Sequence, residues 1–135
     1  MDELLALPLE RGVLLRTLGT LLLVTACGQE QVPEVCGDMC VSATLLYGAC
    51  VQDWGASFEG AGYSSAQGFL ESCDTWAWQR ALFEEEALSE GALNAAGWLA
   101  DTCERGLSLF DAPDAVCSDY FGFDWQAVPS TSEAL

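Results

Sequence analysis

The stretch CGDMCVSATLLYGACVQDW, residues 36–54, decides the fold because it places three cysteines on one face of a single helix. Its cysteine and apolar positions recur at steps of four and three residues: Cys36, Cys40, Ala43, Tyr47, Cys50 and Trp54. Since such steps keep to one side of an α-helix, the pattern predicts a helix with these side chains facing a core. Pro33 suits a first helical position and glycines follow Trp54, so we expect the helix to span about residues 33–54.

The chain beyond this helix supplies one further cysteine for each of its three: Cys73, Cys103 and Cys117. In an oxidising compartment six cysteines favour three disulfides, in any of 15 pairings. Zinc is a poor alternative, because the chain has no histidine and no pair of C-x2-C knuckles. If helix ends meet in sequence order, the bonds are nested, and the predicted pairs are Cys50–Cys73, Cys40–Cys103 and Cys36–Cys117.

Helical periodicity continues beyond the glycine-rich segment. Ser64 and Gln67 have the spacing of a capping box and predict a second helix that ends near residue 87. Ser89 is the expected cap of a third helix, which carries Cys103 on its inner stripe. A short fourth helix is expected over residues 113–120.

The remaining C-terminal sequence has neither helical nor strand periodicity, although three of its aromatic residues are expected to fold back on the core: Phe121, Phe123 and Trp125. The sequence therefore predicts an all-α fold, with three antiparallel helices, a short fourth helix and an irregular tail. We place the disulfide-bonded domain at residues 34–126 and the tail at residues 127–135.

The N-terminal segment has the order of a secretory signal. Arg11 and Arg16 precede an uncharged apolar run, TLGTLLLVTA, at residues 17–26. A run of about 7–15 apolar residues is typical of a signal peptide, whereas a membrane-spanning helix needs about 20. We therefore expect residues 1–26 to be removed as a signal peptide.

The end of that run, VTAC at residues 24–27, resembles the lipobox of bacterial lipoproteins. The resemblance implies cleavage before Cys27, a diacylglycerol linked to its sulfur through a thioether, and acylation of the new N-terminus. Several acyl chains anchor a protein stably, and residues 27–33 would form a short tether. Gly28 in place of an aspartate implies the outer membrane of a bacterial envelope. Assigning Cys27 to lipid also leaves an even number of cysteines for disulfides.

Charge limits the partners of the mature chain. Residues 27–135 hold 18 acidic residues against Arg80 and Arg105, with no lysine or histidine, which gives a net charge of −16. Binding of nucleic acid is excluded because neutralising phosphates requires lysine and arginine. Anionic lipid is disfavoured as a docking surface for the same reason. A basic or neutral protein partner remains, as does a role of the charge in solubility alone.

Enzymatic chemistry has no support in the composition. Catalysis by a nucleophile and histidine, or by serine and lysine, needs residues that the mature chain lacks. The spacing Cys36-x3-Cys40 is not the C-x-x-C of redox enzymes. We therefore expect a non-enzymatic protein without a cofactor.

A divalent cation is one candidate ligand to weigh. Calcium prefers clustered oxygen ligands, and a bend-rich stretch supplies four carboxylates: Asp111, Asp114, Asp119 and Asp124. Their spacing differs from that of the EF-hand loop. Asp111 and Asp114 also fit ordinary turn and helix-cap positions, so both interpretations stay open.

Aromatic and acidic side chains predict a docking surface on the second and third helices. Trp54 and Trp76 fall on the expected inner faces, whereas Trp78 and Trp98 fall outside them. Three acidic residues, Glu84, Glu85 and Glu86, crowd the end of the second helix, where the helix dipole disfavours negative charge. They are either a local cost that packing offsets or part of a docking patch. In the alternative interpretation, a second layer such as the C-terminal tail covers the two tryptophans.

These features together predict a lipid-anchored bacterial envelope protein whose acidic helical domain is a binding module. The alternatives are a purely structural envelope-surface protein and a domain that depends on calcium.

Overall fold

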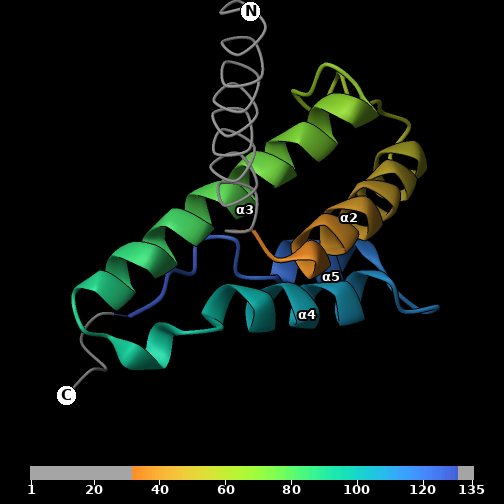
Figure 1. Ribbon diagram of the computed structural model, residues 1–135. Helices are drawn as coiled ribbons and strands as arrows, with labels where there is room; N and C mark the ends of the chain where they lie inside the picture. Colours follow the sequence, from red (N-terminus) through yellow and green to blue (C-terminus); the bar gives the residue numbers. More distant parts are fainter. Residues whose placement is uncertain (1–31, 131–135) are drawn as a thin grey trace, which may run out of the picture. The chain divides into compact units, whose positions relative to one another are not determined.

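The structure, a computed structural model, describes residues 32–130, and the predictions for residues 1–31 and 131–135, lipidation of Cys27 included, lie outside it. Within this range the fold is all-α, as predicted (Figure 1). Its helices are α2 (Glu34–Asp53), α3 (Ala66–Ser89), α4 (Trp98–Phe110) and α5 (Cys117–Gly122), with a 3-10 turn η1 (Leu93–Ala95) between α3 and α4.

Helix α2 is the centre of the fold because each of its three cysteines bonds a different helix. Cys36 is joined to Cys103 of α4, Cys40 to Cys73 of α3, and Cys50 to Cys117 of α5. The prediction that this helix bonds the three other cysteines is confirmed.

The nested pairing predicted from the sequence is wrong in all three pairs. It assumed that Cys50 and Cys73 lie where the ends of α2 and α3 meet. Cys73 is seven residues into α3, or about 10 Å along its axis, and so lies opposite Cys40, farther from the end of α2. The end of α2 packs against α5 instead, where Cys50 bonds Cys117.

One continuous core lies between α2, α3 and α4, and α2 contributes most of its inner stripe to it, from Cys36 to Tyr47. By length and composition α2 is also the one helix among residues 32–130 that is apolar enough to cross a membrane, with a mean hydropathy of 1.3. Since it is the cross-linked core helix, its apolar character is accounted for by the packing. Gly106 of α4 meets it closely: a Cβ atom there would lie 2.5 Å from Met39 Sδ.

Two predicted helix starts are wrong. Ser65, and not Ser64, caps α3, because its hydroxyl accepts the Gly68 N–H at 3.1 Å. Ser89 is the last residue of α3, and its hydroxyl donates to the Glu86 carbonyl. The expected third helix is therefore shorter. Gly91 and Gly97 have φ of 96° and 79°, values at which a right-handed helix cannot continue.

The C-terminal segment runs back alongside α3 (Figure 1). Trp76 Nε1 and Arg80 Nη2 both donate to the Trp125 carbonyl oxygen, at 2.8 and 2.7 Å, and Arg80 Nε donates to the Ala127 carbonyl at 2.9 Å. The prediction that aromatic side chains of the tail fold back is confirmed for Phe123 and Trp125, which pack on the core. It is wrong for Phe121, which is 57% exposed.

Candidate functional site

The four aspartates predicted to hold calcium do not form a ligand cluster. Asp119 accepts the Val116 N–H at 2.8 Å at the start of α5, and Asp124 accepts the Gln126 N–H at 3.1 Å in a turn. Asp111 follows the last residue of α4, and Asp114 lies in the turn after it. Residues 32–130 contain no group of three acidic or cysteine side chains that could hold a metal ion. The interpretation of these aspartates as turn and cap residues agrees with their contacts.

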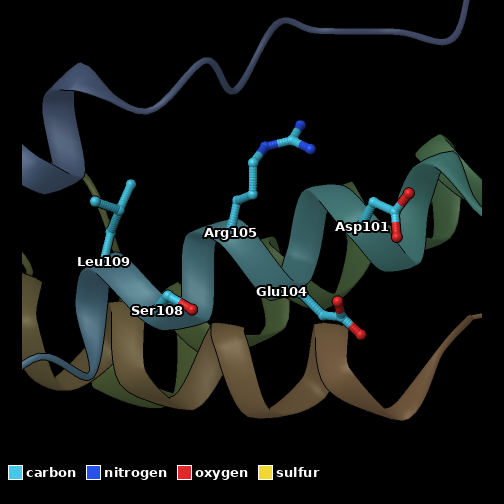
Figure 2. Close-up of a pocket in the computed structure, with 5 residues that line it drawn as sticks. All are labelled: Asp101, Glu104, Arg105, Ser108 and Leu109. Carbon is cyan, nitrogen blue, oxygen red and sulfur yellow. The ribbon is translucent and has the colours of Figure 1, made fainter.

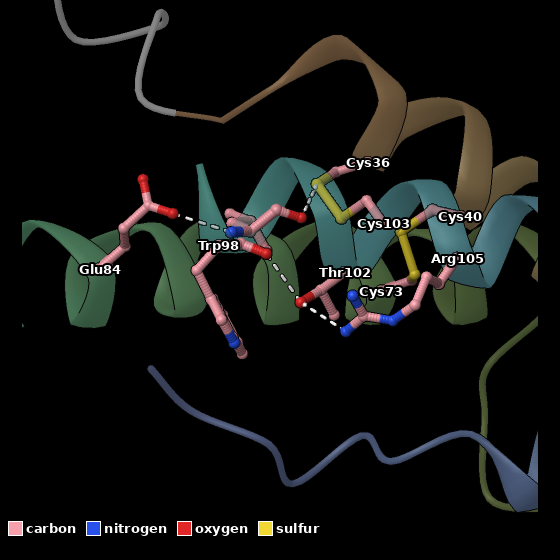
Figure 3. The surroundings of a disulfide bond; sticks show 9 residues. Cys36, Cys40, Cys73, Glu84, Trp98, Thr102, Cys103 and Arg105 are labelled. Atoms are coloured by element: carbon pink, nitrogen blue, oxygen red, sulfur yellow. Dashed lines mark hydrogen bonds between the residues drawn. A yellow bond between two sulfur atoms is a disulfide. The ribbon is translucent and has the colours of Figure 1, made fainter. Parts of the chain in front are cut away.

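The three glutamates at the end of α3, residues 84–86, have different roles. The Glu84 carboxylate accepts the Leu99 N–H at 2.8 Å, so it caps the first turn of α4 (Figure 3). Gly97, the residue before α4, has no side chain to do this. A carboxylate also interacts favourably with the positive end of the helix dipole. Glu85 and Glu86 are exposed on α3, so Glu84 serves the fold and the other two remain at the surface.

The tryptophans also depart in part from their predicted places. Trp54, expected in the core, is 54% exposed, because it follows the last residue of α2. Its ring lies 6.4 Å from that of Tyr47 and 5.9 Å from that of Phe121. Trp76 is half-buried under the C-terminal segment, as its predicted inner face requires. Trp98 packs on the core, whereas Trp78 is 48% exposed. Of the two tryptophans proposed for docking, Trp78 is thus the one presented to solvent.

Trp78 lies at the centre of a stripe that we call the α3 outer face, which consists of Glu71, Asp74, Trp78, Leu82 and Glu85. Steps of three and four residues keep these side chains on one side of the helix. Burial, and secondarily the neighbouring Glu71 carboxylate, raises the pKa of Asp74 above its ordinary value. The face therefore combines an exposed apolar centre with crowded negative charge.

A cavity of about 650 Å³ lies along the outer side of α4. Figure 2 shows its lining side chains, all from this one helix: Asp101, Glu104, Arg105, Ser108 and Leu109. Arg105 extends away from the helix, and its Nη2 donates to Thr102 Oγ1 at 3.4 Å (Figure 3). A cavity lined by a single helix is a shallow depression and does not enclose a ligand.

A smaller cavity of about 180 Å³ lies between α3 and the C-terminal segment, and its wall is mainly aromatic. We call it the aromatic pocket. Its lining residues are Tyr63, Phe69, Ser72, Cys73, Trp76, Tyr120 and Trp125.

Two pairs of rings that line the aromatic pocket are packed edge to face. Trp76 and Trp125 meet at 78° with centroids 5.2 Å apart, and Tyr63 and Phe69 meet at 68° with centroids 4.9 Å apart. Tyr120 lies 5.2 Å from Trp125 and 5.8 Å from Phe69, so it joins the two pairs. Neighbouring rings thus differ in orientation around one small volume.

The polar groups of the aromatic pocket are either satisfied or neutral. The indole N–H groups of Trp76 and Trp125 donate to the carbonyl oxygens of Trp125 and Tyr120, at 2.8 and 3.0 Å. Burial, followed by the nearby Tyr63 and Tyr47, raises the pKa of Tyr120, so its phenol stays protonated at neutral pH. No charged side chain lines the wall.

No protein-family model, curated protein or solved structure matches this chain.

Sequence reasoning did not find the aromatic pocket. Phe69, Ser72, Cys73 and Trp76 share one face of α3, at helical spacing. The other three lining residues, Tyr63, Tyr120 and Trp125, come from the loop before α3 and from the segment around α5, and no local spacing links them to that face. The available signal was the presence of aromatic residues in glycine-rich, irregular sequence, at Tyr63 and around Tyr120. Large rings in such segments need a surface to pack against; here Tyr63 packs against Tyr47 of α2, and Tyr120 packs against Trp125.

Proposed function

We propose that this chain is an exported, lipid-anchored and non-enzymatic binding module of a bacterial envelope, and that its α3 outer face docks a basic segment of a protein partner. The observation that carries the docking proposal is the exposure of Trp78, 48%, among carboxylates of the same face.

The chemistry of the face supports a cationic partner. Tryptophan is enriched among the residues that contribute most to protein interfaces, and exposed apolar groups with a polar rim are typical of such surfaces. Leu82, 37% exposed, extends the apolar centre by one helical turn. The only cations of residues 27–135, Arg80 and Arg105, lie elsewhere, on the tail side of α3 and on α4. Complementary charge on a partner would speed association and exclude acidic competitors.

The proposed location in a bacterial envelope rests on two features of different kinds. The lipobox-like sequence at residues 24–27 lies outside the described range, and three disulfides are typical of proteins exported to an oxidising compartment. Intact mass of the protein from bacterial membranes, before and after reduction and alkylation, tests both. We expect acyl chains on Cys27 and six thiols that appear only on reduction. An unmodified Cys27, or free thiols without reduction, would contradict the proposal.

Docking is tested with a defined probe, a synthetic amphipathic helix of leucine and lysine, against the same peptide with glutamate in place of lysine. We expect the lysine peptide alone to bind, more weakly as ionic strength rises. Trp78→Ala should lower the affinity at least tenfold, whereas Trp54→Ala, which removes an equally exposed tryptophan from another face, should leave it unchanged. Equal loss in both variants, or binding of both peptides, would refute docking at this face and favour a purely structural role.

A further inference from the structure

We propose that the aromatic pocket binds a methylated ammonium group, such as the trimethylammonium head of choline. The inference goes beyond the docking function, because it concerns a small organic cation and a different side of α3.

The wall of the aromatic pocket offers what a diffuse cation requires. Aromatic faces carry negative electrostatic potential, and cages of several rings are the usual means by which proteins recognise quaternary ammonium groups. Here five rings line the volume, and the planes of two ring pairs are inclined to each other at 78° and 68°, so the rings differ in orientation. A methylated ammonium has no strong hydrogen-bond donor to satisfy, which suits a wall whose indole N–H groups are already engaged.

The volume limits the size of the ligand. At about 30 Å³ per water molecule in the liquid, a cavity of 180 Å³ corresponds to about six waters. Pockets for drug-sized molecules occupy about 300–1,000 Å³. The aromatic pocket therefore suits a compact head group with a few carbon atoms around one centre.

The electrostatic surroundings of the aromatic pocket favour one sign of charge on the ligand. No arginine lines the wall, and the mature chain has a net charge of −16, so an anion would find neither a partner nor a favourable field. The hydroxyl of Ser72 already donates to the Gly68 carbonyl at 3.0 Å, and the Tyr120 phenol is protonated. A cation gains from electrostatic attraction to the ring faces and to the acidic surroundings, whereas a neutral molecule of the same shape gains only apolar contact with the rings.

The first test compares choline with its neutral carbon isostere, 3,3-dimethyl-1-butanol, on the full chain in a detergent without choline groups. Calorimetry gives the affinities, and the tryptophan indole N–H signals in NMR locate the site. We expect choline to bind about 3- to 30-fold more tightly than the isostere, the range that cation–π attraction implies. Equal binding of the two, or no binding of choline at millimolar concentration, would overturn the proposal.

Two pairs of variants separate the aromatic pocket from the rest of the fold. Ser72 is exposed on α3 at the pocket wall, so Ser72→Leu should obstruct the pocket and abolish choline binding, whereas Ser72→Ala should leave it unchanged. Tyr63→Leu removes one ring face and should weaken binding severalfold, and Tyr63→Phe should not. Near-ultraviolet circular dichroism confirms that each variant is folded. Unaltered binding in both Ser72→Leu and Tyr63→Leu would refute the assignment to this pocket.

The source of the group is distinguished with monomeric dihexanoylphosphatidylcholine. Competition with choline at the same indole signals, at equal or higher affinity, identifies a lipid head group as the ligand, while binding of choline alone identifies a free small molecule. Trp78→Ala should affect neither, because Trp78 does not line the pocket. If choline does not bind but the lysine peptide still does, only the proposal for the aromatic pocket is refuted, and the docking proposal stands.

Discussion

Arg80 should contribute far more to stability than Arg105, the other arginine of residues 32–130, although both carry the same charge. Its guanidinium donates to two carbonyl oxygens of the C-terminal segment, at 2.9 and 2.7 Å, and lies 5.5 Å from the ring centroids of both Trp76 and Phe83. Arg105 makes one hydrogen bond of 3.4 Å, within its own helix. We therefore expect Arg80→Met to destabilise the domain and Arg105→Met to have little effect.

The magnitude follows from these contacts. A hydrogen bond to a charged group contributes about 1.5–3 kcal/mol, and Arg80, which is half-buried, belongs at the lower end of that range. Ring contacts add about 0.5–1 kcal/mol, while the rotamer freedom regained on unfolding subtracts about 1–2 kcal/mol. Methionine keeps the packing of the side-chain stem. With the two hydrogen bonds of Arg80 counted, the free energy of unfolding should fall by about 1.5–3 kcal/mol for Arg80→Met and by less than about 0.5 kcal/mol for Arg105→Met.

Urea denaturation of the oxidised proteins, followed by tryptophan fluorescence, measures both changes. Each variant raises the negative charge by one, so a difference between them cannot come from general repulsion. Chymotrypsin provides a local readout, because release of the tail should open cleavage around Trp125 in Arg80→Met only. Equal stability of the two variants, or a tail that stays protected in Arg80→Met, would refute the conclusion that this arginine holds the C-terminal segment.

Three other predictions concern single residues. Gly106→Ala should destabilise by about 1–3 kcal/mol in urea denaturation, because its Cβ would meet the methionine sulfur of α2 at 2.5 Å; Gly37→Ala, where no atom lies within 4 Å, should not destabilise. Glu84→Ala should cost about 1 kcal/mol through loss of the α4 cap, and the same change at Glu86 should cost less than about 0.5 kcal/mol. Since the pKa of Asp74 is raised in the folded state, its ionisation opposes folding; Asp74→Asn should stabilise at neutral pH, and the gain should vanish below the ordinary pKa of aspartate. A gain independent of pH would contradict that reasoning.

The sequence was most informative about α2. Its predicted span agrees with Glu34–Asp53 to within a residue, because proline before the helix and glycine after it are local signals that tertiary packing did not override. The starts of α3 and α4 were harder to place. Ser64 and Ser65 are both good caps, and only the backbone conformation decides between them. The start of α4 is capped from another helix by Glu84, a contact that no local pattern contains.

Disulfide pairing and the aromatic pocket were beyond sequence reasoning for a shared physical reason. Both depend on how far one element slides along another, and a helix advances only about 1.5 Å per residue, so a few residues of offset exchange one partner for another. Cys73 lies within bonding distance of Cys40, with a Cα separation of 5.6 Å, because of such an offset. The pocket in turn requires Tyr63 and Trp125, which are far apart in the chain, to line one volume.

The covalent links and the acidic surface are connected. The net charge of −16 on residues 27–135 opposes a compact state. The two arginines of this range are too few to offset it with ion pairs, especially since Arg80 binds backbone carbonyls of the tail. The core interface of α3 offers small side chains such as Ala77 and Ala81, which bury little apolar area. Bonds from one central helix to three others stabilise the fold by restricting the unfolded chain, about 2–4 kcal/mol each, independently of surface charge. The surface is thereby free to be as acidic as its proposed cationic ligands require.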